Sequence, residues 1–289
     1  MSKPAKKTVI IFFDTDKHAS PFDILTAVDL FPDAQIITYS NVEPQDSKRI
    51  IQDAMFPPFE LAVIVDPRGA YTTASAAVAK TLSAMLEKNL GDFKGKTVTV
   101  LAGTGPVGQV ASRLYAMEGA NVVVTSRDLS RSKAVANKVN QEVGSERARG
   151  VQAPSPHEVG EAIIDSQIVL SAGAAGITLL HSIALKEFGR NCRVVADINA
   201  VPPLGVEGLK STDENVEIFP GVWGIGALAI GTFKNKVEAQ LFKRTVESPK
   251  GIFDYTVAYE IAKSIVLAKL QKSGEKKNPG EGARNLLPY

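Results

Sequence analysis

The chain has 289 residues, of which 44% are hydrophobic and 22% charged, a composition ordinary for a globular enzyme that is long enough for two domains. Its formal net charge of +2 gives no reason to expect nucleic acid or an anionic membrane as a partner. A single cysteine, Cys192, excludes an intrachain disulfide framework, and the 3 histidines form no metal-ligand motif, so we expect no metal site.

The first residues, 1–7, are basic and contain no cleavable apolar region. No apolar run reaches the roughly 20 residues that span a bilayer. We therefore expect a cytoplasmic protein with no membrane partner.

The first ninety residues alternate between apolar runs typical of strands and segments of helical spacing. Three such βα units predict a small, open, parallel α/β sheet, which we assign to an N-terminal substrate domain over residues 1–92. The predicted strands are 8–13, 35–39 and 61–65, and the predicted helices begin at Ser20 or cover 44–54 and 73–90.

A glycine-rich turn then follows a strand predicted over residues 97–102. Gly103, Gly105 and Gly108 have the spacing of the dinucleotide-binding fingerprint, and a helical pattern follows them. The first glycine permits the tight turn, the second lets backbone approach a pyrophosphate, and the third lets the helix pack closely on the strand. The whole turn is a predicted cofactor site, consisting of Gly103, Thr104, Gly105, Pro106, Val107 and Gly108.

The next predicted strand, 121–126, ends on Ser126 and Arg127, where an NAD site usually has an acidic residue. A guanidinium matches a phosphate, so Ser126, Arg127 and Arg131 predict NADP as the cofactor, and use of NAD remains open. The alternative for Arg131 and Lys133 is an ordinary solvated helix face.

The rest of the chain continues the α/β alternation. It predicts a two-domain α/β fold, with a Rossmann-type NADP-binding domain over 93–235 and helices within 236–271 that pack back on the N-terminal domain. Residues 272–289 have the composition of a flexible tail. The predicted elements are helices at 130–143, 236–245 and 255–270, a capping box at 155–158, and strands at 168–172 and 193–198.

Ligands of such sheets bind at the carboxyl ends of the strands. The loops there are therefore the candidate site, and Ala172 and Gly173 in one of them are expected cofactor contacts. The candidate loops are 14–18, 66–73, 172–176 and 197–205.

Several of these segments resemble the bacterial NAD(P)-dependent methylene-tetrahydromethanopterin dehydrogenases, which are distantly related to methylene-tetrahydrofolate dehydrogenases. The resemblance implies hydride transfer from the methylene carbon of a reduced pterin to NADP, and it also implies a homo-oligomer. The segments that carry it are 13–16, 21–23, 72–74, 101–108, 196–205 and 226–234.

The resemblance also implies roles for individual residues. Lys234 matches a lysine beside the pterin, and we expect it to be catalytic; the alternative is a surface lysine. For Asp14 and Asp16, pterin binding and turn capping are both open. The remaining expectations are substrate contacts at His18, Thr72 and Thr73, with helix capping as the alternative for the threonines, and a role for Asn199 in shaping the nicotinamide end of the cofactor site.

Three other functions remain open. A methylene-tetrahydrofolate dehydrogenase of the kind with a Tyr-x-x-x-Lys pair is disfavoured, because Tyr71 is followed four residues later by Ser75. A shikimate-type dehydrogenase needs a Lys-Asp pair, for which Lys17 and Asp66 are the candidates. An NADP-binding redox sensor without catalysis is also compatible with the fingerprint.

Overall fold

A computed structural model describes residues 9–13, 35–39 and 62–277 of the chain. Its centre is a seven-stranded sheet with the order β6-β5-β4-β7-β8-β10-β9, in which β9 alone is antiparallel to its neighbour. Without β9, this is the strand order 3-2-1-4-5-6 of the dinucleotide-binding fold. The strands are β4 (Thr97–Leu101), β5 (Asn121–Ser126), β6 (Ala148–Gln152), β7 (Ile168–Ser171), β8 (Val194–Asp197), β9 (Glu214–Phe219) and β10 (Val222–Ile225).

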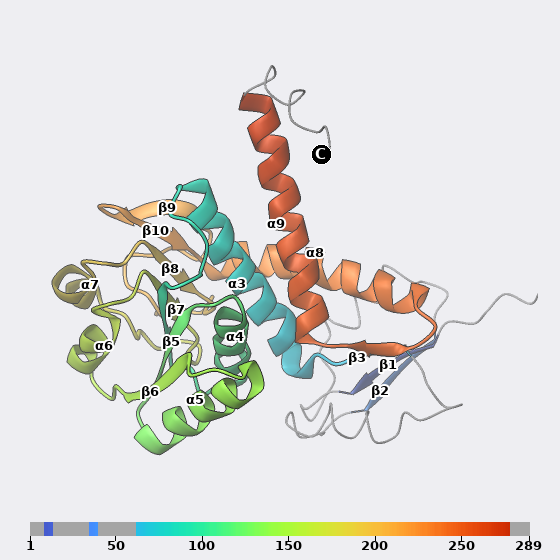
Figure 1. The fold of residues 1–289 in the computed structure, drawn as a ribbon, viewed down its shortest axis with the longest axis horizontal. Coiled ribbons are helices and arrows are strands. Elements are labelled where there is room, and N and C mark those ends of the chain that lie inside the picture. Colours follow the sequence, from blue (N-terminus) through green and yellow to red (C-terminus); the bar gives the residue numbers. More distant parts are fainter. Residues whose placement is uncertain (1–8, 14–34, 40–61, 278–289) are drawn as a thin grey trace, which may run out of the picture.

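The central strands are apolar on both faces because helices cover both sides of the sheet (Figure 1). Side chains alternate along β7: Ile168 and Leu170 belong to one core, and Val169 belongs to the other. The first core lies under α3 (Ala70–Glu87), α4 (Pro106–Met117) and α5 (Leu129–Val143), and the second lies under α6 (Pro156–Ile163) and α7 (Ser182–Phe188).

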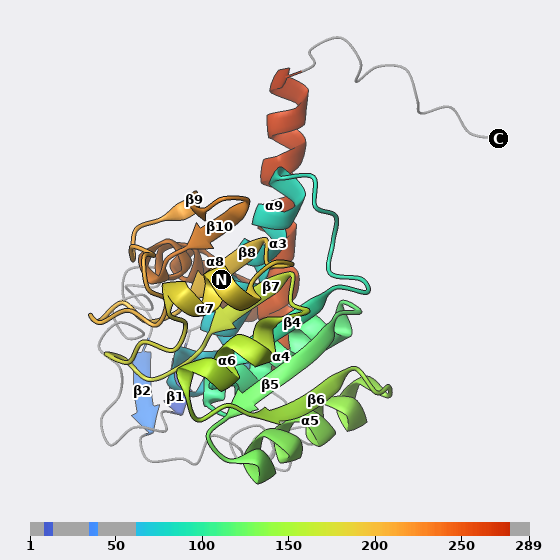
Figure 2. The same cartoon turned by 90° about the vertical axis from the view of Figure 1, so that its left-hand side faces the viewer.

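Helix α3 is buried along most of its length, between the sheet and the last two helices, α8 (Ala227–Glu247) and α9 (Tyr255–Lys277) (Figures 1 and 2). Many of its buried residues are alanines, for example Ala76, Ala77 and Ala79, which leave room for the neighbouring helices to approach closely. The C-terminal end of α9 projects beyond the rest of the described fold.

Two short parallel strand pairs lie outside the large sheet. β1 (Val9–Phe13) pairs with β2 (Gln35–Tyr39), and β3 (Ala62–Ile64) pairs with β11 (Gly251–Phe253). The C-terminal part of the chain thus adds a strand beside the N-terminal segment. Among the described helices, none has the length and apolar content needed to cross a membrane.

Most local predictions match the elements observed, and the differences have physical causes. The capping box is present, with Ser155 and Glu158 bonded reciprocally at the start of α6. Helix α8 begins at Ala227 rather than at 236, because the glycines near its start conceal the helical pattern. Helix α3 begins at Ala70 rather than at 73. The predicted helices at Ser20 and at 44–54 lie outside the described residues.

Candidate cofactor and substrate site

The glycine-rich loop lies at the switch point of the sheet, where β4 has β5 on one side and β7 on the other. Ligands of open α/β sheets bind in the crevice at such a point. Thr125 of β5 anchors the loop: its hydroxyl accepts a hydrogen bond from the Ala102 N–H at 3.1 Å, and its carbonyl accepts one from the Gly103 N–H at 2.9 Å. Ala102 itself has φ of 50°, an uncommon angle for a residue with a side chain.

The three fingerprint glycines have different surroundings, which correspond to different functions. A Cβ atom on Gly103 would lie 2.9 Å from Val124 Cγ1, and one on Gly108 would lie 2.6 Å from Gly103 Cα. Both positions therefore need glycine for packing. A Cβ on Gly105 would only make ordinary contacts, at 3.9 Å from the carbonyl oxygens of Ala102 and Ala172, and Gly105 is partly exposed, so packing inside the chain does not require glycine at this position.

The N-terminus of α4 has no side-chain cap. Gly105 is the N-cap residue, Pro106 is in the first turn, and the first turn has no acidic residue. Backbone N–H groups at such a helix start bind phosphates. The arrangement therefore fits a pyrophosphate, because the donors are not used by a side-chain cap and the glycine beside them lets a ligand approach the backbone.

At the end of β5, the predicted phosphate-binding residues differ in burial. Ser126 is buried, and its hydroxyl accepts a hydrogen bond from the Asp128 N–H at 3.2 Å. Arg127 and Arg131 are exposed. The nearby carboxylate of Asp128 caps α5 by accepting hydrogen bonds from Ser130 N at 2.7 Å and Arg131 N at 3.4 Å. These hydrogen bonds, first those from Ser130, lower the pKa of Asp128.

The loops after β7 and β8 form the neighbouring wall. The carbonyl oxygen of Ala172 is 3.9 Å from the Cβ position of Gly105, so the β7 loop faces the glycine-rich loop. A side chain on Gly173 would meet Leu179 at 2.6 Å. Asn199 braces its own loop, donating to the Pro203 carbonyl at 3.1 Å and accepting from the Val201 N–H at 2.9 Å.

On the opposite side, Lys234 of α8 lies against the start of α3. Its Nζ atom is 3.1 Å from Oε2 of Glu238, one helical turn further on. Only 17% of the Lys234 side chain and 6% of the Glu238 side chain are exposed. A Cβ on Gly69, where φ is 64°, would lie 3.4 Å from the same Nζ. Lys234 is thus held in a mostly buried position.

Asp66 joins this group from the loop before α3. Its carboxylate accepts hydrogen bonds from the Tyr71 N–H at 2.7 Å and the Thr72 hydroxyl at 2.5 Å. Burial raises the pKa of Asp66, and the Thr72 hydroxyl and the positive charge of Lys234 act in the opposite direction. The structure brings Asp66 near Lys234; Lys17, the partner suggested for Asp66 in a shikimate-type enzyme, lies outside the described residues.

The structure describes only some of the other predicted substrate residues. Thr72 is fully buried with its hydroxyl on Asp66, and Thr73 is the next residue of α3. Asp14, Asp16, Lys17 and His18 lie outside the described residues. Glu238 was not among the predicted site residues. The feature that points to it is its position four residues after Lys234 on the same helix, which places the two side chains side by side.

Cys192 is fully buried, and burial raises the pKa of its thiol to about 12. The thiolate is the reactive form of cysteine, so we expect no reaction of the native protein with an aromatic disulfide reagent at about pH 8. The unfolded protein should release one equivalent of the coloured thiolate. Rapid modification before unfolding would contradict this assignment.

Comparison with known proteins places the chain in a family. It is 32% identical over 293 residues to a protein of Methylorubrum extorquens named "Bifunctional protein MdtA", covering 90% of this chain and 99% of that protein. It is 30% identical over 286 residues to the "NAD(P)-dependent methylenetetrahydromethanopterin dehydrogenase" of the same organism, covering 86% of this chain and 95% of the relative. No family model matches the sequence.

Solved structures with the same fold are more distant in sequence. A quinate dehydrogenase from Corynebacterium glutamicum has a TM-score of 0.51 and 16% identity, over 89% of this chain and 99% of that one. A shikimate 5-dehydrogenase from Listeria monocytogenes has a TM-score of 0.51 and 14% identity, over 92% and 99%. These likenesses show a two-domain dehydrogenase fold. The near full-length relatives show more: the chain belongs to the family of NAD(P)-dependent methylenetetrahydromethanopterin dehydrogenases.

Proposed function

We propose that the chain oxidises methylene-tetrahydromethanopterin to methenyl-tetrahydromethanopterin with NADP as the hydride acceptor, as an enzyme of one-carbon metabolism. The observation that carries the proposal is the uncapped start of α4 at Gly105, a glycine that packing does not require, in a chain of this family. NADP, when bound, would take up the hydride at C4 of its nicotinamide.

The residues that would hold NADP come from three loops. The backbone N–H groups at the start of α4 would bind the pyrophosphate, beside Ala172 and Gly173. Ser126, Arg127 and Arg131 would bind the 2′-phosphate of the adenosine ribose. Asn199 would keep the β8 loop in shape beside the nicotinamide.

The pterin would lie on the side of Lys234 and Thr73, with Asp14, Asp16 and His18 as its further proposed contacts. Loss of a hydride from the methylene carbon leaves a cation, so no proton has to be removed. Lys234 would orient the pterin through hydrogen bonds. Asp66 and Glu238 lie close to Lys234 and offset its charge, which favours a cationic product at this place.

The direct test is nicotinamide reduction by the purified protein, with NADP or NAD and with the methylene derivative of tetrahydromethanopterin or of tetrahydrofolate. We expect reduction with the methanopterin derivative and NADP. Activity with the folate derivative alone would favour a methylene-tetrahydrofolate dehydrogenase. Absence of reduction in all four mixtures would contradict the proposal and leave dinucleotide binding to be tested separately.

One observation favours a second candidate, a shikimate-type alcohol dehydrogenase. Oxidation of an alcohol releases a proton as well as a hydride, and a lysine near a carboxylate can take up that proton. Lys234 and Asp66 form such a neighbouring pair. Reduction of NADP or NAD with shikimate or quinate, in the absence of any pterin, would support this alternative.

The Arg127 assignment predicts a change in cofactor preference. In the variant Arg127→Ala we expect the Kd of NADP to rise about tenfold to a hundredfold, since a charge-assisted contact contributes about 1.5–3 kcal/mol. The Kd of NAD should stay unchanged, because NAD has no 2′-phosphate. Calorimetric titration with both cofactors measures this, with Lys138→Ala, an exposed lysine on the following helix α5, as control. Equal weakening of both cofactors would contradict the assignment.

Three further proposals concern the oligomeric state of the protein, its location in the cell and its division into domains. We propose a homo-oligomer, supported by the projecting end of α9 with Leu267 40% exposed, and light scattering tests it. We propose a cytoplasmic location, which cell fractionation tests. We also propose the division into a substrate domain (1–92 with 236–271), a cofactor domain (93–235) and a tail (272–289), for which limited proteolysis is the test. Because α8 continues across the 235/236 boundary and α9 continues to Lys277, we expect no cleavage at those two boundaries themselves.

A further inference from the structure

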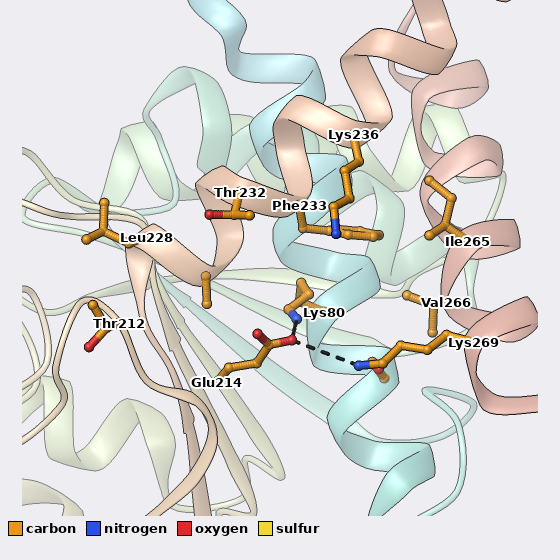
Figure 3. Close-up of a pocket in the computed structure, with 12 residues that line it drawn as sticks. Lys80, Thr212, Glu214, Leu228, Thr232, Phe233, Lys236, Ile265, Val266 and Lys269 are labelled. Atoms are coloured by element: carbon orange, nitrogen blue, oxygen red, sulfur yellow. Dashed lines mark hydrogen bonds and ion pairs between the residues drawn. The ribbon is translucent and has the colours of Figure 1, made fainter. Parts of the chain in front are cut away.

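A hollow of about 310 Å³ lies between α3, α8 and α9 (Figure 3). Lys236 lines the hollow, and it is two residues from Lys234, roughly 200° around the helix. Neither Lys234 nor any residue of the glycine-rich loop lines the hollow. It is therefore separate from the cofactor and substrate site.

Three lysines from three different helices direct their ammonium groups into this space: Lys80 of α3, Lys236 of α8 and Lys269 of α9 (Figure 3). Among the residues that line it, Glu214 is the one carboxylate, so the lining has a formal charge of +2. An adjoining hollow of about 270 Å³ adds the carboxylate of Glu87. Lys269 Nζ lies 3.9 Å from Glu87 Oε1 and 4.0 Å from Glu214 Oε1, and three ammonium groups against two carboxylates leave the balance positive.

Lys80 is the most buried of the three lysines that line the hollow. Only 9% of this residue is exposed, it is paired with Glu214, and its Nζ lies 5.7 Å from the centre of the Phe233 ring. A buried ammonium group needs compensating negative charge. The Lys80 hydrogen bond to Glu214 lowers the pKa of that carboxyl.

The remaining lining is suited to a ligand that is both charged and partly apolar. Hydroxyl groups of Thr212 and Thr232 add hydrogen-bond donors near the lysines, whereas the Ser83 hydroxyl donates to Glu87 at 2.8 Å. Leu228, Phe233, Ile265 and Val266 form the apolar wall. The volume is at the lower end of that of small-molecule sites.

We propose that this hollow binds a small multivalent anion, a phosphate ester or a polycarboxylate, between Lys80, Lys236 and Lys269. The ammonium groups and hydroxyls would donate hydrogen bonds to its oxygens. The proposal is independent of the reaction assigned above, because it uses none of the residues of that site.

The test is calorimetric titration with two probes, inorganic pyrophosphate and citrate, each on the protein saturated with NADP and on the protein alone. We expect saturable binding of at least one probe, at one site per chain, in both states and weakening with added salt. In Lys236→Ala and in Lys269→Ala the Kd should rise about tenfold each, because each removes a charge-assisted contact. Lys243→Ala, an exposed lysine on α8 outside the hollow, should bind as the unchanged protein does.

The comparison of probes identifies the ligand class: binding of pyrophosphate alone indicates a phosphate ester, and binding of citrate alone indicates a polycarboxylate.

Three results would overturn the proposal. The first is no binding of either probe. The second is binding that Arg127→Ala abolishes and the two lysine variants leave intact, which would assign the anion to the cofactor site. The third is an oligomer, seen by light scattering, that Lys236→Ala and Lys269→Ala dissociate, because a second copy would then fill the hollow. Because Lys236 and Lys269 are exposed, we expect both alanine variants to keep the melting temperature of the unchanged protein. A preserved melting temperature shows that the variants are folded.

Discussion

The variant Lys234→Ala is expected to lose turnover and to keep its cofactor. We expect kcat for the pterin to fall about a hundredfold, because a small misplacement of two reacting carbons has an effect of this size. The Kd of NADP should stay within about twofold, a change of less than 0.5 kcal/mol. Lys234 belongs to α8, and its side chain lies against the start of α3 and not against the glycine-rich loop. Steady-state kinetics and calorimetry on the same preparation measure the two quantities.

The control for this variant is Lys243→Ala, which removes an exposed lysine from the same helix. It should leave kcat and the melting temperature unchanged. Full turnover of Lys234→Ala would remove Lys234 from the mechanism. A parallel loss of NADP binding would instead indicate a general collapse of the site.

Glu238 complicates the alanine variant, because its carboxylate is only 6% exposed and Lys234 is its ion-pair partner at 3.1 Å. Removing one member of a buried pair destabilises a protein by about 3–5 kcal/mol, whereas removing both is often neutral. The double variant Lys234→Met with Glu238→Gln therefore serves as the folded reference. It should regain the melting temperature of the unchanged protein and still lack turnover.

The part of the site that sequence predicts well is the part made by neighbours along the chain. Strand β4, the glycine turn and α4 are continuous, and their apolar spacing and glycine positions specify them locally. Asp66 and Lys234, in contrast, are far apart in sequence and meet only because α8 crosses the start of α3. Proximity between residues so far apart in sequence leaves no periodic signal, so the sequence does not predict it.

The strands that the sequence did not predict also depend on contacts between residues far apart in the chain. β6 and β9 are edge strands with mostly polar, partly exposed residues, so they lack the apolar run that marks β5 or β7. β11 has three residues and depends on its pairing with β3. Here tertiary contact, and not local preference, determines the structure.

The largest effect on cofactor binding is expected at Gly105. Its φ of −74° and ψ of 168° are ordinary for alanine, and a Cβ there meets no atom closer than 3.9 Å. Gly105→Ala should therefore fold normally and gain up to about 1 kcal/mol in unfolding free energy, because the unfolded chain loses freedom. The added methyl group would occupy the space into which the pyrophosphate must approach. We expect the Kd values of NADP and NAD both to rise at least about tenfold, as charge-assisted hydrogen bonds of about 1.5–3 kcal/mol are lost.

Gly108→Ala is the matched comparison in the same loop, and its effect should be of the opposite kind. Its Cβ would lie 2.6 Å from Gly103 Cα, and backbone cannot move aside as a flexible side chain can. Alanine is favoured over glycine inside a helix by about 1 kcal/mol, but overpacking against backbone costs about 1–3 kcal/mol, so the variant should be less stable. Thermal unfolding without cofactor, followed by titration with NADP, separates the two variants. Loss of stability in Gly105→Ala, or unchanged NADP affinity in it, would contradict the assignment of Gly105 as the point at which the pyrophosphate approaches the backbone.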